Sequence, residues 1–134
     1  MRPRWRLCLE AQPTAGTSLP ATDAAALDRL RRFGGATLLG KMIDLFLVAA
    51  PERIEAASRA RVAGDAEGAE RALHSLKSSS AQLGALRMQR LSEQGEQRAR
   101  AGLLDEVAQV TAALDEELAR VREWLLDARE QGAA

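Results

Sequence analysis

Apolar side chains recur every three or four residues along most of the chain, which is the spacing of an amphipathic helix. Four stretches follow this pattern over a substantial length, at about residues 37–62, 66–83, 85–101 and 104–127. A shorter stretch, 24–33, follows the capping residues Thr22 and Asp23 and precedes Gly34 and Gly35, a pair typical of a helix end. The pattern predicts four long helices preceded by one short helix.

Short turns join the four long segments, and short connections place consecutive helices side by side and antiparallel. We therefore predict an all-α fold, an antiparallel up-down four-helix bundle in which the short N-terminal helix caps one end. The bundle is expected to span residues 22–129. Residues 1–21 are rich in proline and small polar residues and lack an apolar face, so they predict a flexible leader, and residues 130–134 a flexible tail.

Two residues interrupt the helical pattern. Pro51 removes a backbone donor and crowds the preceding turn, so we expect a kink, or a break with Pro51 at the first position of a new helix. Gly95 lies on the apolar side of the weakest helix, where glycine costs about 1 kcal/mol relative to alanine. We therefore expect Gly95→Ala to raise the melting temperature.

Length, charge and the apolar runs argue against several classes of protein. The 134 residues suffice for one domain, and 19 Lys and Arg balance 19 Asp and Glu without a basic block, which argues against a nucleic-acid partner. The apolar run 45–50 is far shorter than the roughly 20 residues of a membrane span, and Arg4 and Arg6 interrupt any signal-peptide core. The single Cys8 forms no internal disulfide. We expect a cytoplasmic protein without a membrane partner.

His74 is the only histidine in the chain. On a helical wheel it lies opposite the apolar stripe of residues 66–83, so its ring is expected to point outward. If the helices on either side of Gly84 run antiparallel, residues whose numbers sum to about 170 lie at the same height. This rule pairs His74 with Glu96, Lys77 with Glu93, and Glu70 with Arg100.

This arrangement predicts a nucleophile. A carboxylate beside an imidazole accepts the Nδ1 proton, which leaves Nε2 as a free outward lone pair. Lys77, one turn after His74, would place an ammonium where a phosphoryl group on Nε2 needs a compensating charge. Ser78 and Ala81 are small and border the ring, so a partner could approach it. Exposed interhelical ion pairs, worth about 0 to 1 kcal/mol each, would also account for the charges, but not for the histidine.

The residues around His74 resemble the signature of histidine-containing phosphotransfer (HPt) domains, which reads roughly A-H-x-L-K-G-x-x-x-x-L-G-A. Residues 73–85 read LHSLKSSSAQLGA. Ser78 stands where the family usually has glycine, and Gly95 where it often has leucine. Three segments before the histidine are also similar to this family, so the resemblance covers about residues 22–127. These segments are DRLRRFGG at 28–35, DLFLVAAPERI at 44–54 and AGD at 63–65.

The resemblance implies a phosphotransfer protein of a two-component phosphorelay. His74 would accept a phosphoryl group from a receiver-domain aspartate or from a hybrid or sensor histidine kinase, and return it to a response-regulator aspartate. Lys77 and Glu96 match the family's lysine and its acidic or amide residue that contacts the histidine. The chain would be a monomeric phosphoryl carrier rather than an enzyme, with Ser78 and Ala81 in its docking surface. It would bind no cofactor, because the partner receiver supplies Mg²⁺.

Other functions fit the sequence less well. The alternative within the same family is a degenerate module that docks receivers or kinases without phosphotransfer, but His74, Lys77 and Glu96 are all present. A di-iron bundle needs two Glu-x-x-His motifs, and one histidine cannot supply them, so we expect no metal site. No serine or cysteine has a second base available for triad chemistry.

Overall fold

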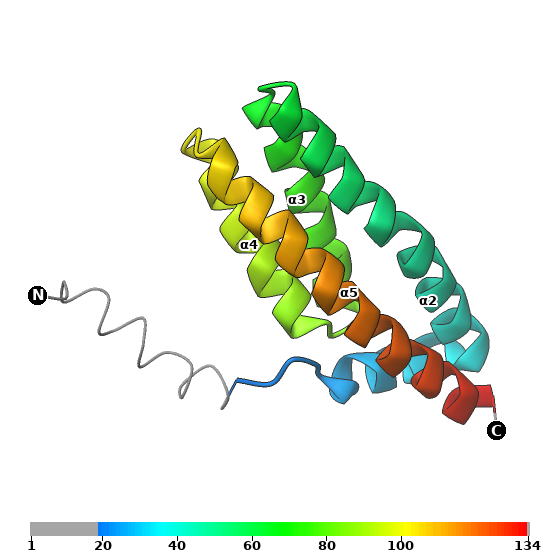
Figure 1. Cartoon of the computed structure of the whole chain (residues 1–134). Helices are drawn as coiled ribbons and strands as arrows, with labels where there is room; N and C mark the ends of the chain where they lie inside the picture. The colour runs from blue at the N-terminus through cyan, green and yellow to red at the C-terminus, as the bar shows by residue number, and fades with distance from the viewer. Residues whose placement is uncertain (1–18, 134) are drawn as a thin grey trace, which may run out of the picture.

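The helices expected from the apolar periodicity are all present in the computed structural model, which describes residues 19–133. They are labelled as in Figure 1: α2 (Ala24–Val62), α3 (Ala66–Gln82), α4 (Leu86–Arg100) and α5 (Leu104–Ala133). The described residues contain no strand, so the all-α class is confirmed. Residues 1–18 of the expected leader lie outside the described residues.

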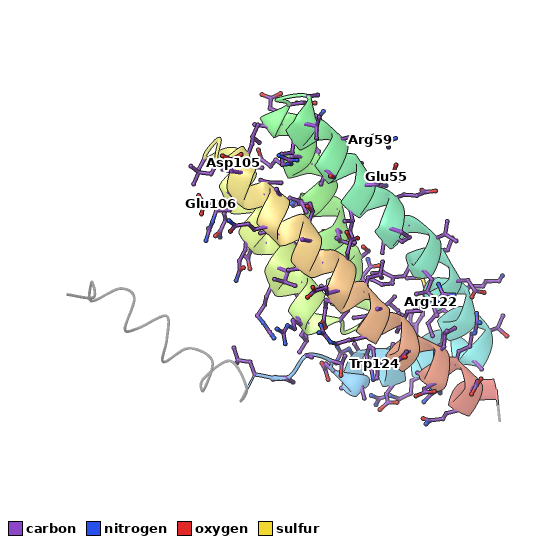
Figure 2. All side chains as sticks on the ribbon, viewed as in Figure 1. Glu55, Arg59, Asp105, Glu106, Arg122 and Trp124 are labelled. Carbon is purple, nitrogen blue, oxygen red and sulfur yellow. The ribbon has the colours of Figure 1, made fainter. Side chains whose placement is uncertain are left out.

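The four helices enclose one apolar core. Helices α2 and α4 each pack against both α3 and α5, which closes the bundle (Figure 1). Most charged residues lie on the outer faces; Glu55 and Arg59, for example, project from α2 into solvent in Figure 2. The largest fully buried apolar side chains come from all four helices: Leu39, Ile43, Leu73, Leu76, Leu83, Met88, Leu114, Leu125, Val107 and Val121.

The expected interruption after the short N-terminal helix is present at Gly35. This residue has φ 75° and ψ −173°, so α2 consists of two helical segments that meet there, and the first crosses the base of the bundle in Figure 1. Its N-cap, Asp23, accepts a hydrogen bond from the backbone N–H of Ala25 and donates its own to the carbonyl of Gly84 at 2.8 Å. Gly84 has φ 74°, and a Cβ on it would lie 2.9 Å from Cβ of Ala26. Glycine at this turn therefore lets the N-terminal segment dock.

Pro51 does not break α2. Backbone dihedrals stay helical through this residue, and Gly35 is the one non-helical position within α2. The expected break is therefore wrong. Pro51 is exposed, whereas its neighbours Ala50 and Ile54 are buried in the core. Their packing holds the helix together across the missing backbone hydrogen bond.

Both ends of the bundle extend further than the sequence indicates. Helix α5 continues to Ala133, so residues 130–133, for which the sequence predicts a flexible tail, are helical. An ion pair between Arg129 and Asp44 of α2 ties this last part of α5 to the bundle. At the other end, Arg87 donates its backbone N–H to the carbonyl of Ala21 at 3.0 Å, and the Arg90 guanidinium donates to the carbonyl of Pro20 at 3.0 Å. Residues assigned to the leader thus contact α4.

Helix α2 has an unusually apolar composition. Among the described residues it is the one helix that is long and apolar enough to cross a bilayer by length and composition alone. A core helix of a soluble bundle meets the same criterion, and one face of α2 supplies the buried residues Leu39, Ile43 and Phe46. Leu45 and Val48 lie exposed on the outer side.

Helix α4 approaches α3 and α5 closely at Gly95. A Cβ on this residue would lie 2.8 Å from Cδ1 of Leu73 and 2.9 Å from Cγ1 of Val110. Leu73 is fully buried, and Val110 is β-branched with few rotamers and packs against the core, so neither side chain moves aside at little cost. The expectation that alanine stabilises this position is therefore corrected: the glycine is needed for the close approach of three helices.

We predict that Gly95→Ala lowers the melting temperature. Overpacking a core costs about 1 to 3 kcal/mol, which exceeds the roughly 1 kcal/mol gained in helix propensity. Gly40→Ala in α2 is the matched control, because a Cβ there would meet only Cδ of Arg129 at 3.9 Å, an ordinary contact. Thermal unfolding should show the control at a higher melting temperature than the parent. An equal rise in Gly95→Ala would contradict the packing argument.

Candidate functional site

The imidazole of His74 stands on the outer face of α3. Its side chain is 59% exposed, whereas Leu73 and Leu76 on the inner face of the same helix are fully buried. The outward position expected from the helical wheel is therefore confirmed. A reactive group placed in this way is open to a macromolecular partner and not enclosed in a pocket.

His74 contacts Glu96 of α4, as the equal-height rule predicts. Nδ1 of His74 lies 2.8 Å from Oε1 of Glu96. The Glu96 side chain is only 6% exposed, so the carboxylate is held between α3 and α4 beneath the ring. When Nδ1 carries the proton and donates it to this carboxylate, Nε2 keeps its lone pair and points away from the bundle.

Lys77 joins the same carboxylate. Its Nζ lies 2.8 Å from Oε2 of Glu96, and its side chain is about one quarter exposed. The expected pairing of Lys77 with Glu93 is therefore wrong. Side chains on a helix lean toward its N-terminus, so the long lysine side chain reaches back toward the level of His74, where Glu96 is available.

Arg100 connects the site to a second acidic residue. Its Nε and Nη2 each lie 2.9 Å from Oε1 of Glu70 on α3, which is the pair that the sequence predicts. Nη2 also lies 3.4 Å from Oε1 of Glu96. Sequence reasoning missed this second contact, although the i,i+4 spacing of Glu96 and Arg100 on α4 is a signal for it.

The electrostatics of the site favour an ionised Glu96. Burial by itself raises the pKa of this carboxyl, but the hydrogen bonds and the charges of Lys77 and His74 outweigh burial. The pKa of Glu96 therefore lies below its ordinary value. At neutral pH the group is a carboxylate and can accept the Nδ1 proton of His74.

Ser78 and Ala81 are both exposed on α3, on the side of the helix that carries His74. The hydroxyl of Ser78 donates to the carbonyl oxygen of His74 at 3.3 Å. The serine that replaces the family's usual glycine thus turns its hydroxyl back to the helix and not toward a partner.

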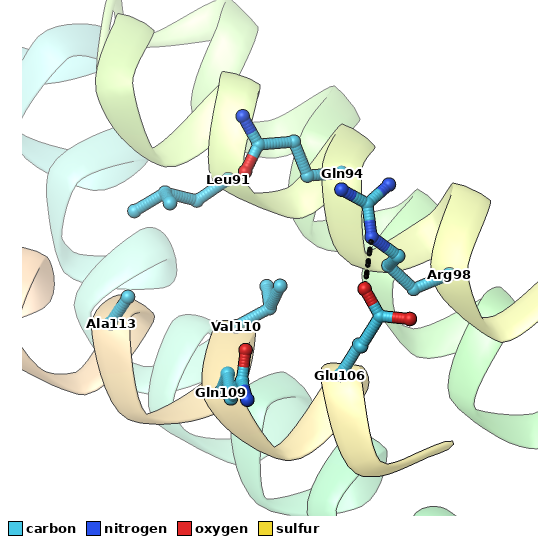
Figure 3. Close-up of a pocket in the computed structure, with 7 residues that line it drawn as sticks. All are labelled: Leu91, Gln94, Arg98, Glu106, Gln109, Val110 and Ala113. Atoms are coloured by element: carbon cyan, nitrogen blue, oxygen red, sulfur yellow. Dashed lines mark hydrogen bonds and ion pairs between the residues drawn. The ribbon is translucent and has the colours of Figure 1, made fainter. Parts of the chain in front are cut away.

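Two grooves of the bundle lie away from His74. Figure 3 shows one between α4 and α5, with the Arg98–Glu106 ion pair (Nε to Oε1, 3.2 Å) at one end and Leu91 and Val110 among the lining residues. A second groove lies between α2 and α5, beside Pro51. Neither is lined by His74, Lys77 or Glu96. Within residues 19–133, no three His, Cys, Asp or Glu side chains gather in a way that could hold a metal ion.

We predict that the contribution of Glu96 to stability depends on pH. Because the pKa of Glu96 is lower in the folded than in the unfolded chain, its stabilisation is complete above the ordinary value of 4.5. It is lost as the pH falls through the lowered pKa. Glu96→Gln should therefore reduce the free energy of unfolding at neutral pH, and this difference should shrink in acid. Denaturant titrations across that range measure it.

Glu93→Gln is the control for this prediction, because Glu93 is exposed on the same helix. Its difference from the parent should stay small at every pH. A difference for Glu96→Gln that does not change with pH would contradict the prediction.

Comparison with known proteins agrees with this geometry. A family model for the Hpt domain matches residues 41–124, more than half of the chain. The crystal structure of histidine-containing phosphotransfer protein B (HptB) from Pseudomonas aeruginosa PAO1 is similar to this chain, with a TM-score of 0.78 and 26% sequence identity. The match covers 84% of this chain and 96% of that chain. A search of curated proteins finds no match. The chain therefore belongs to the Hpt domain family, whose function is histidine phosphotransfer in phosphorelays.

Proposed function

We propose that this protein is a phosphoryl carrier of a two-component phosphorelay, and that His74 is its phosphoacceptor. One observation carries the proposal: an exposed imidazole whose Nδ1 lies 2.8 Å from a buried carboxylate, with Nε2 left free. Donors would be a receiver-domain aspartyl phosphate or a hybrid or sensor histidine kinase. The final acceptor would be a response-regulator aspartate.

The transfer step balances without a further reactant. The Nε2 lone pair attacks phosphorus of the aspartyl phosphate, the N–P bond forms, and the P–O bond to the aspartate breaks, so its electron pair returns to the carboxylate. The ring keeps its Nδ1 proton and becomes a positively charged phosphoimidazole. The Glu96 carboxylate, 2.8 Å from Nδ1, stabilises that charge. The reverse step passes the phosphoryl group to the next aspartate.

Lys77 is proposed to support the transferred group. Its ammonium binds Glu96 at 2.8 Å, yet the side chain is partly exposed and lies one turn from His74. From there it can turn toward phosphoryl oxygens and offset their charge. The partner receiver would supply the Mg²⁺ and the aspartate, so this chain would bind no cofactor and would not be an enzyme by itself.

We also infer the finer architecture that presents His74: an antiparallel up-down bundle spanning residues 22–129 and capped by the segment before Gly35. Two ion pairs across α3 and α4, His74–Glu96 and Glu70–Arg100, join residues whose numbers sum to the same value, as antiparallel neighbours require. The hydrogen bond between Asp23 and Gly84 supports the cap. We propose that the protein acts as a cytoplasmic monomer.

We predict that His74 is the site of phosphorylation. When the protein is mixed with a phosphorylated receiver domain, the label should appear as acid-labile, base-stable phosphate, as expected of a phosphoramidate. His74→Gln should fold normally and stay unlabelled, because an amide nitrogen has no available lone pair. Labelled His74→Gln would refute the assignment. A parent that binds receivers but takes no label would instead indicate a degenerate docking module.

We predict that the surface beside His74 tolerates little bulk. Phosphorus must come within roughly 3 to 3.5 Å of Nε2, which leaves no room for a long side chain one turn away. Ser78→Gly should transfer at least as fast as the parent, because the hydroxyl bonds only the helix backbone. Ser78→Arg and Ala81→Trp should prevent receiver binding, with stability within about 0.5 kcal/mol of the parent.

Receiver affinity and transfer rate measure this effect. Ala112→Trp is the control, since it adds the same bulk to an exposed alanine on α5 and should leave both quantities unchanged. Normal transfer by Ser78→Arg and Ala81→Trp would place the docking surface elsewhere.

A further inference from the structure

We propose that Arg100 is a positioning residue of the phosphotransfer site and that Glu70 anchors it. In this arrangement Glu70 fixes the Arg100 guanidinium, which in turn holds the Glu96 carboxylate against His74. The proposal rests on the proposed function, because it assigns Arg100 and Glu70 a part in the reactivity of His74. It goes beyond the three residues that the resemblance assigns.

The contacts run without a gap from Glu70 on α3 to Arg100 and Glu96 on α4, and from there back to His74 on α3. Arg100 is bound firmly at one end, with Nε and Nη2 both 2.9 Å from Oε1 of Glu70. At the other end Nη2 lies 3.4 Å from Oε1 of Glu96, the oxygen that also lies 2.8 Å from Nδ1 of His74. The two shorter contacts to Glu70 therefore fix the position of the guanidinium. From that position, Nη2 makes the longer contact to the Glu96 carboxylate.

Hydrogen-bond geometry explains why the buried Glu96 carboxylate needs Arg100 to keep its orientation. Each carboxylate oxygen accepts up to two hydrogen bonds, and Glu96 receives Lys77 on Oε2 and His74 and Arg100 on Oε1. Donors on both oxygens from three directions fix the rotation of the carboxylate plane. Without Arg100, Oε1 has only the imidazole as a partner, and the carboxylate can rotate toward Lys77 and away from Nδ1.

The charges give a second reason. Lys77 binds Glu96 in this structure, yet during transfer it is proposed to turn to the phosphoryl oxygens. A carboxylate that is 6% exposed is strongly disfavoured when its cation leaves. Arg100 stays beside Glu96 because Glu70 holds it, so Lys77 can move without leaving the buried charge unpaired. The positioning role therefore includes freeing Lys77 for the phosphoryl group.

The tautomer of His74 gives a test that does not require phosphotransfer. Because the chain has one histidine, its ring nitrogens give an unambiguous ¹⁵N NMR signal pair. At a pH where the ring is neutral, the parent should show mainly the Nδ1–H tautomer. Arg100→Gln and Glu70→Gln should shift the population toward the Nε2–H tautomer, which free imidazole side chains favour. A surface ion pair that only stabilises the fold would not change this ratio.

Phosphotransfer from a labelled receiver is the second readout. Arg100 is 63% exposed, so its removal should slow transfer only about two- to fivefold, the range of an exposed ion pair. Arg100→Lys should restore part of the rate, because it keeps the charge without the second contact to Glu70. In a Glu96→Ala background Arg100→Gln should cause no further loss, since its effect passes through Glu96.

Arg98→Gln and Glu106→Gln are the matched controls. They remove the same two charges from an ion pair of similar exposure that joins α4 to α5, on a different side of α4 (Figure 3). Both should keep the parent's tautomer ratio and transfer rate, and circular dichroism should show all variants folded.

The outcomes separate this proposal from the proposed function. If Arg100→Gln keeps the parent's tautomer ratio and transfer rate while Glu96→Ala loses them, Arg100 is an ordinary surface residue and the positioning role is refuted. If the parent takes no phosphoryl group from any phosphorylated receiver, the proposed function fails. The tautomer ratio then still decides whether Arg100 positions Glu96.

Discussion

The carboxylate of Glu96 is almost removed from water, and a group of this kind persists in a fold only where donors surround it. Three side chains meet it: His74 and Lys77 from α3, and Arg100 from α4 itself. Together these donors fix the carboxylate, and the fixed carboxylate orients the imidazole through Nδ1. The orientation of the imidazole, and hence the direction of its free nitrogen, therefore depends on this one buried charge.

Close packing of α3 and α4 makes that arrangement possible. Gly95, next to Glu96, brings α4 within van der Waals distance of Leu73, which directly precedes His74. Gly84 shapes the turn between the two helices and leaves room for the N-terminal segment to dock beside it. The glycines thus set the distance between the helices, and the polar contacts of Glu96 form across that distance. Gly95, which sets the distance between the helices, is therefore adjacent to Glu96, which orients the reactive imidazole.

The site has a supported inner side and an open outer side. Glu96 and the buried leucines hold the imidazole from beneath, while the ring and its neighbours Ser78 and Ala81 are exposed. Neither of the two grooves described above includes the ring. Such a surface suits a side chain that another protein must contact and then leave. Chemistry that needs water excluded would be completed by that partner, consistent with a carrier in a phosphorelay.

The sequence by itself determined the helices and the outward face of His74, because both follow from the 3.6-residue period and from local caps such as Asp23. It also paired His74 with Glu96 and Glu70 with Arg100, since a tight turn fixes the relative height of two helices. Tertiary structure decided the rest. Lys77 binds Glu96 and not Glu93, Gly95 is needed for close approach, and α2 continues through Pro51. These outcomes depend on distances between helices and on core packing, which act across the chain and leave no local signal in the sequence.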